Sequence, residues 1–124
     1  MNLVLNHTVV RSADKDAAAR FFAGLLGLEV GEPAGPFLPV RVNADLTLDF
    51  DDRHALAPAH FGFLVDDDGF DQILRRLDEL PDVPFGSGPE HGWDRRINQL
   101  AGGRGVYVGA PDGHSYEFFT VPPT

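Results

Sequence analysis

Two histidines stand in apolar runs where an aliphatic side chain would pack more easily. His7 lies within "NLVLNHTVV", and His60 opens the run "HFGFLV". Two acids are placed similarly, because Asp49 in "TLDFD" and Glu117 in "SYEFF" each lie between large apolar residues. Imidazole nitrogen and carboxylate oxygen are ligands that zinc, nickel, cobalt, manganese and iron(II) accept. These four side chains therefore have the chemistry of a divalent metal site.

The spacing of these residues indicates an internal repeat. Each histidine precedes a predicted helix-capping acid by seven residues, His7 before Asp14 and His60 before Asp67. The acid follows the histidine by 42 residues in the first half and by 57 in the second. The difference is close to the length of the polar stretch "SGPEHGWDRRINQLAGG", which predicts an insertion near residues 86–103 in the second copy. Four ligand-type residues at equivalent positions predict metal binding.

Each candidate ligand also has an ordinary structural explanation. A single histidine in a strand is more often a hydrogen-bonded structural residue than a ligand. Asp49, close to other aspartates, fits a solvated strand end, and its side chain is one methylene shorter than that of glutamate. Glu117 is harder to explain in that way, since a carboxylate buried between Tyr116 and Phe118 needs a partner. The repeat therefore supports the prediction more than any single residue does, and Asp49 is the weakest candidate.

The elements that must position these residues follow a βαβββ order in the first half. Residues 3–10 are rich in β-formers and predict a strand. A helix is predicted from Asp14 to about Leu26, with Asp14 or Ser12 as its cap and Gly27 as its stop. The segment "LEVGEPAGP" predicts a short strand and a turn, and "FLPVRVN" and "LTLDFDD" predict two further strands.

The same order restarts at "AHFGFLVDD", a strand that runs into an acidic helix cap. Pro81 is expected to end the helix predicted in "GFDQILRRLDELP". The apolar residues of that helix recur at helical spacing: Phe70, Ile73, Leu74, Leu77 and Leu80. Strands are predicted in "VPFG", "RGVYVGA" and "HSYEFFTV", with "APDG" as a type I turn.

We therefore predict an α+β fold that forms a single domain. It consists of two βαβββ modules, residues 1–56 and 57–124. Each module is a curved mixed sheet with a helix packed outside, and together they form a cleft. Because side chains alternate along a strand, the polar candidates face the cleft, and the wholly apolar face of each strand is turned away from it.

Composition narrows the classes of function. The chain has 124 residues and no cysteine, so it forms no disulfide framework, and any metal is held by nitrogen and oxygen. A formal net charge of -9 argues against binding to nucleic acid or to a membrane surface. The chain starts without a basic leader, and its most apolar later region is interrupted by Arg20. We expect a cytoplasmic protein that is neither secreted nor membrane-spanning.

These motifs resemble those of the vicinal oxygen chelate superfamily, which includes glyoxalase I, methylmalonyl-CoA epimerase, fosfomycin-resistance enzymes, extradiol dioxygenases and bleomycin-resistance proteins. The resemblance covers nearly the whole chain through "LNHTVVRSADKDAAARFFAGLLGLEV", "HFGFLVDD" and "GGRGVYVGAPDGHSYEFFT". Only Ala110 departs from the family's "DPDG" turn. The resemblance implies a homodimer whose metal sites each take His7, with or without Asp49, from one chain and His60 and Glu117 from the other.

The resemblance also implies that one divalent metal per site chelates adjacent oxygens of a small molecule. Our preferred hypothesis is a glyoxalase-like lyase or isomerase, in which Glu117 is catalytic and moves a proton next to a carbonyl. Asp49 is then a ligand or a second base. One alternative is a metal-free protein that binds a drug or metabolite, although such bleomycin-resistance proteins typically lack the ligands. The other is an iron(II) ring-cleaving dioxygenase, although such enzymes are usually longer chains of four modules.

The polar loop of the second half is the candidate substrate-binding region. It is long for a connection, and long loops often carry function. Four of its residues are expected to cover the cleft and select the substrate: Trp93, Arg95, Arg96 and Asn98. The two arginines fit a structural role equally well, as partners of the many surface acids.

Overall fold

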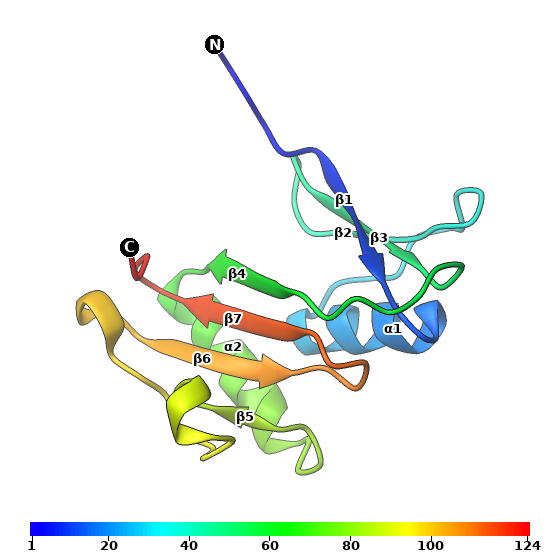
Figure 1. Cartoon of the computed structure of the whole chain (residues 1–124). Helices are drawn as coiled ribbons and strands as arrows, with labels where there is room; N and C mark the ends of the chain where they lie inside the picture. Colours follow the sequence, from blue (N-terminus) through cyan, green and yellow to red (C-terminus); the bar gives the residue numbers. More distant parts are fainter. The chain divides into compact units, whose positions relative to one another are not determined.

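The computed structural model describes all of residues 1–124, which divide into two compact units, Met1–Ala57 and Pro58–Thr124 (Figure 1). Each unit contains one α-helix and one mixed sheet, so the predicted α+β fold of two βαβββ modules is confirmed. Neither α-helix has the length and apolar character needed to cross a bilayer. The two units are described in turn.

The sheet of the first unit contains three strands, in the order β1 (His7–Arg11), β3 (Thr47–Asp51) and β2 (Leu38–Arg41). β1 is parallel to β3, and β2 is antiparallel to it. The short strand predicted in "LEVGEPAGP" is present only as a single bridge between Val30 and Val40. Pro33 and Pro36 follow it, and they have no N–H group with which to extend a ladder.

Helix α1 (Lys15–Leu26) ends where predicted, and Asp14 is the cap of the two candidates, Asp14 and Ser12. The Asp14 side chain accepts a hydrogen bond from the Ala17 N–H at 3.1 Å. Gly27 ends the helix in the left-handed conformation with φ of 67°, which glycine adopts without strain. The helix packs against β2 and β3, and the rings of Phe22 and Phe50 lie 6.1 Å apart in this core.

The sheet of the second unit contains four strands, in the order β4 (His60–Leu64), β7 (Ser115–Phe119), β6 (Gly105–Gly109) and β5 (Phe85–Gly86). β4 is parallel to β7, whereas β6 is antiparallel to both of its neighbours. Helix α2 (Asp67–Asp78) lies behind this sheet in Figure 1. The unit buries these apolar residues: Phe70, Ile73, Leu77, Phe85, Val106, Val108, Tyr116 and Phe118.

Two predictions about helix α2 were wrong. Its cap is Asp66, whose side chain accepts a hydrogen bond from the Gly69 N–H at 2.7 Å, and not Asp67. Three consecutive aspartates offer the same capping chemistry, so residue type alone does not select among them. The helix also ends at Asp78, and Leu80, predicted as helical, lies outside it with 39% of its surface exposed.

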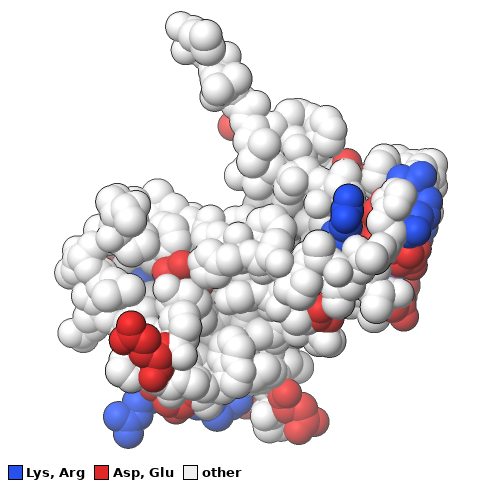
Figure 2. All heavy atoms as spheres, viewed as in Figure 1, with Lys and Arg blue, Asp and Glu red and all other residues white.

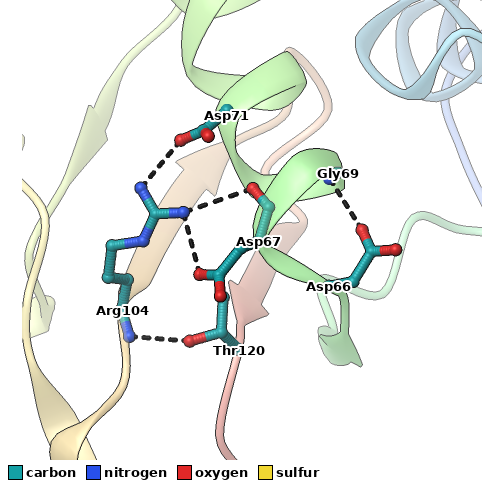
Figure 3. A network of polar contacts seen from close by, with 6 residues as sticks. All are labelled: Asp66, Asp67, Gly69, Asp71, Arg104 and Thr120. Atoms are coloured by element: carbon teal, nitrogen blue, oxygen red, sulfur yellow. Dashed lines mark hydrogen bonds and ion pairs between the residues drawn. The ribbon is translucent and has the colours of Figure 1, made fainter.

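Asp67 is instead a partner of Arg104, which ties the start of β6 to helix α2 (Figure 3). The Arg104 guanidinium donates hydrogen bonds to the carboxylates of Asp71 at 2.8 Å and Asp67 at 3.0 Å. It also lies 4.6 Å from the centre of the Phe70 ring. The Arg104 backbone N–H donates to the Thr120 hydroxyl at 2.9 Å. Since the two carboxylates are exposed, these ion pairs add little to the stability of the fold, and their main effect is to position helix α2 relative to β6.

A long loop, residues 87–104, joins β5 to β6 at the position predicted for an insertion. It contains two single-turn 3₁₀ helices, Pro89–His91 and Leu100–Gly102. The shorter connection between β6 and β7 is the predicted tight turn, in which the Gly113 N–H donates to the Ala110 carbonyl at 3.0 Å. Gly113 has φ of 93°, a conformation that other residues adopt only with strain.

Candidate functional site

His60 and Glu117 lie side by side on one face of the second unit's sheet. In the β4–β7 register, Glu117 lies two residues beyond the partner of His60. His60 Nε2 is 2.9 Å from Glu117 Oε1. The Glu117 side chain is 8% exposed and that of His60 is 51% exposed. A nearly buried carboxylate therefore contacts an imidazole that solvent can reach. A buried carboxylate needs a polar partner, and the imidazole of His60 is one.

Tyr107 completes this cluster, although the sequence interpretation did not select it. It lies opposite Glu117 in the β6–β7 register, its hydroxyl is hydrogen-bonded to the Glu117 carboxylate, and its ring centre is 5.7 Å from that of His60. Burial raises the pKa of Tyr107, and the charge of Glu117 and the hydrogen bond raise it further. The phenol is therefore a neutral donor at neutral pH. The signal that would have identified it is the period of two in "RGVYVGA".

His7 and Asp49 occupy the equivalent positions in the first unit. In the β1–β3 register, Asp49 again lies two residues beyond the partner of the histidine. The spacings of 42 and 57 residues therefore describe one register relationship in both units. The surroundings differ, since His7 Nδ1 contacts Asn6 Oδ1 at 2.9 Å, and Pro39 is the residue opposite Asp49 on β2.

His60 and Glu117 are the two residues of the second unit that could hold a divalent metal ion. An imidazole nitrogen and a carboxylate oxygen are both ligand atoms that such ions accept. The observed distance between Nε2 and Oε1 is 2.9 Å. Neither unit alone brings together three or more residues of the types that bind metals. The pair therefore needs additional ligands to form a complete site.

A cavity of about 620 Å³ opens beside the imidazole, and it belongs entirely to the second unit. Its size suits a small organic molecule. Figure 2 shows that the face of this unit opposite α2 is mostly uncharged, with charged side chains gathered along its lower edge. The cavity is lined by these residues: His60, Gly88, Pro89, Gly92, Trp93, Tyr107 and Ser115. The arrangement presents an imidazole and two hydroxyl groups among apolar walls.

Trp93 is the one predicted substrate-binding residue that lines this cavity. Arg95 lies elsewhere, with its guanidinium 4.3 Å from the centre of the Phe85 ring. It also donates hydrogen bonds to the carbonyl oxygens of Val83 at 3.0 Å and Leu77 at 3.3 Å. Arg95 therefore fastens the loop, although its partners are carbonyls and a ring instead of the surface acids considered from the sequence.

Asn98 also fastens the loop. Its side-chain amide donates a hydrogen bond to the Ser87 carbonyl at 2.9 Å, and its backbone pairs with Gly105 at the start of β6. The side-chain oxygen of Asn98 accepts from the Leu100 N–H at 3.1 Å. Arg96 is exposed and is not among the residues that line the cavity.

Comparison with known proteins gives matches among solved structures. No protein-family model and no curated protein sequence matches the chain. Oxidase ChaP-H2 is 44% identical over 98% of this chain and 96% of its own, with a TM-score of 0.88. Oxidase ChaP-H1 is also 44% identical, over 98% of each chain, with a TM-score of 0.87.

More distant structures share the fold alone. The glyoxalase / bleomycin resistance protein from Catenulispora acidiphila is 23% identical over 97% of this chain and 100% of its own, with a TM-score of 0.70. The two matches at 44% identity cover nearly the whole chain. The motifs in the sequence, the two βαβββ modules and these matches lead to one family. The chain belongs to the vicinal oxygen chelate superfamily, which comprises glyoxalases, bleomycin-resistance proteins and dioxygenases.

Proposed function

We propose that the protein is a metal-dependent enzyme that oxidises a small organic molecule beside the His60–Glu117 pair. The observation that carries this proposal is the pair itself, with an imidazole nitrogen and a carboxylate oxygen 2.9 Å apart next to a cavity of about 620 Å³. The reaction class is supported by the two relatives at 44% identity, both of which are named oxidases. The electron acceptor that we propose is dioxygen.

His60 and Glu117 are the residues of the second unit that would hold the metal ion. When bound, the ion supplies a Lewis acid at which adjacent oxygens of a substrate can bind. Tyr107 donates its hydroxyl hydrogen to Glu117 and so keeps that carboxylate oriented. Trp93 and Pro89 form apolar walls that exclude water from the bound substrate.

We further propose a homodimer in which a second chain completes each site. Each unit carries one histidine and one acid in the same register, and neither unit brings together three ligands. His7, with Asp49 as a fourth candidate, would add to the His60–Glu117 pair of the other chain. Such a site has the three or four protein ligands that bound zinc and similar ions require.

A glyoxalase-like lyase or isomerase is the second candidate function. It is favoured by the position of Glu117, a nearly buried carboxylate beside an imidazole and a small-molecule cavity. A carboxylate in that position can take a proton from the carbon next to a carbonyl and return it. Proton exchange of an α-hydroxyketone with deuterated water, without consumption of dioxygen, would distinguish this reaction from the oxidase.

The proposal is tested first by metal analysis of the purified protein and two variants. We expect about one transition-metal ion per chain in the unsubstituted protein, and its loss in His60→Ala and Glu117→Ala, because each removes one of the few ligands. His54→Ala is the matched control, since His54 is exposed and lies outside the cluster. Failure of the unsubstituted protein to bind nickel, cobalt, zinc, manganese or iron(II) would leave the metal-free binding protein as the better proposal.

The reaction class is tested with the metal-loaded protein in an oxygen electrode. A panel of catechols and other small vicinal diols supplies the adjacent oxygens that the proposed site binds. We expect dioxygen consumption with at least one compound, and loss of that consumption in Glu117→Ala. A product in which the aromatic ring has been opened would indicate the dioxygenase alternative, whereas turnover without dioxygen would indicate the lyase or isomerase.

A further inference from the structure

Trp93 is half exposed, with 52% of its surface accessible, although it forms one wall of the cavity. It is the single tryptophan of the chain. A side chain this exposed is not held in place by core packing. One support is the backbone of β6, because a Cβ atom at Gly109 would lie 3.1 Å from Cζ2 and 3.2 Å from Cη2 of the indole. The indole thus lies directly against a glycine of the sheet.

The next residue, Asp94, fastens the backbone that carries the indole. Its Oδ1 accepts hydrogen bonds from the N–H groups of Ser87 at 2.9 Å and Arg96 at 3.0 Å. Its Oδ2 accepts from the Ser87 hydroxyl at 2.6 Å. Hydrogen bonds to a charged oxygen are stronger than neutral ones. The hydroxyl of Ser87, followed by the backbone N–H groups, lowers the pKa of Asp94 against the effect of burial, so this carboxylate is charged at neutral pH.

The segment around Trp93 also lies directly on β5. A Cβ atom at Gly86 would lie 2.5 Å from the Gly92 carbonyl oxygen and 3.0 Å from the Asp94 nitrogen. The Arg95 N–H donates to the Phe85 carbonyl at 2.9 Å. These contacts position the backbone on both sides of the indole. The Asp94 side chain connects the two parts of the backbone, since it links Ser87, directly after β5, to Arg96, after Trp93.

We infer that Asp94 is a positioning residue that holds the Trp93 indole in place and so sets the width of the cavity beside His60. This inference rests on the proposed function only in that the same cavity takes the substrate. Without the Asp94 carboxylate, three hydrogen bonds are lost, and the segment that carries the indole is held near β5 only by the neighbouring contacts of Arg95 and Asn98. The indole then no longer forms a fixed wall, and the cavity opens to solvent on that side.

The inference is tested by fluorescence, because Trp93 is the sole tryptophan. In Asp94→Ala we expect the acrylamide quenching constant of Trp93 to rise about twofold, from a half-exposed to a fully exposed indole, at a temperature well below the unfolding transition. Ser87→Ala, which keeps the carboxylate, should give a smaller rise and serves if Asp94→Ala does not fold. Asp82→Ala is the matched control for removal of an exposed aspartate.

A purely structural role for Asp94 would lower the melting temperature without changing the quenching of the folded protein. Unchanged quenching in both Asp94→Ala and Ser87→Ala would therefore overturn the inference. Cobalt(II), bound at the His60–Glu117 pair, gives a second readout that needs no substrate. We expect it to quench Trp93 less at saturation in Asp94→Ala than in the unsubstituted protein, with an unchanged half-saturating concentration. Equal quenching at saturation would count against the inference.

The two proposals fail in different ways. If cobalt(II) does not bind the unsubstituted protein, the proposed metal site is wrong, and the acrylamide measurement still decides the role of Asp94. If cobalt(II) binds and acrylamide quenching is the same in all variants, the metal site stands and the positioning role of Asp94 is wrong.

Discussion

Glu117 is the residue on which the candidate chemistry depends, and two neighbouring side chains form hydrogen bonds with its carboxylate. It is almost buried, so its charge needs donors to replace water. His60 Nε2 lies 2.9 Å from its carboxylate, and the Tyr107 hydroxyl donates to it from the neighbouring strand. His60 faces solvent and is a candidate metal ligand, whereas Tyr107 donates a hydrogen bond that orients the carboxylate.

We predict that Tyr107→Phe weakens metal binding by about 10–100-fold, because it removes a hydrogen bond that orients a ligand while the cavity keeps its shape. Competition with a chromophoric chelator measures this affinity without turnover. Tyr116→Phe is the matched control, since Tyr116 lies on the opposite face of β7 and should leave the metal affinity unchanged. Equal affinities in the unsubstituted protein and Tyr107→Phe would contradict the orienting role.

Asp51, in the first unit, is a buried carboxylate with a structural role. Arg53 donates hydrogen bonds to both of its oxygens, each at 3.0 Å. These bonds outweigh the effect of burial and lower the pKa of Asp51 from 3.8 to about 2. A pKa that is lower in the folded than in the unfolded chain stabilises the fold when the group is ionised. The contribution is complete above about pH 4 and is lost as the pH falls toward about 2.

We therefore predict that Asp51→Asn flattens the decrease in the free energy of unfolding between about pH 4 and pH 2. Urea unfolding at a series of pH values measures this slope. Asp45→Asn, at an exposed position, should keep the slope of the unsubstituted protein. The same slope in Asp51→Asn and in the unsubstituted protein would show that the Arg53 pair does not stabilise the fold.

At the scale of elements, helix α2 must start at the correct residue to cover the sheet that carries His60 and Glu117. Asp66 caps its first turn, and Asp67 and Asp71 connect that turn to Arg104 at the start of β6. Neighbouring aspartates thus have different roles. Asp66 caps the helix because its backbone is extended, whereas Asp67 forms a salt bridge, which requires only that its side chain be close to Arg104.

We predict that Asp66→Ala lowers the free energy of unfolding by about 1 kcal/mol, the usual effect of removing a helix cap. Asp68→Ala, an exposed residue of the same turn, should cost much less. Urea unfolding followed by circular dichroism provides the comparison. If Asp68→Ala destabilises the protein as much as Asp66→Ala does, the first turn depends on its total negative charge instead of on one cap.

At the scale of the whole molecule, the question is how two incomplete ligand pairs form a site. His7 and Asp49 belong to the first unit, and His60 and Glu117 belong to the second. We propose that the pairs combine across a homodimer, and this proposal makes a prediction about mixed dimers. Mixing unfolded His7→Ala and His60→Ala chains and refolding them together should restore one metal site per mixed dimer.

The restored site would contain the His7 of the second variant and the His60 of the first. Metal content after size-exclusion chromatography, compared with each variant refolded alone, gives the measurement. Sites formed within single chains predict no restoration, since every chain in the mixture lacks one histidine. A protein that elutes as a monomer would also contradict the proposal.

The sequence by itself determined the order of elements, the end of helix α1 at Gly27 and the equivalence of the two histidine–acid pairs. These features depend on local periodicity, on caps and on spacing within one repeat. Local patterns were insufficient where several neighbours had the same chemistry, as at the three aspartates where helix α2 begins. The prediction of a short strand before β2 was also wrong, since the β-propensity of that segment did not outweigh the effect of the nearby prolines.

Only the tertiary structure decided which residues surround the pairs. The roles of Tyr107, Arg95 and Asn98 depend on the register of strands and on a loop that folds back onto β5. Such contacts join residues far apart in the chain, and one residue of shift in a strand would turn its side chains to the other face. Register alone does not separate the two histidines, because both pairs share it; only the structure shows that His60 meets Glu117, whereas His7 contacts its neighbour Asn6.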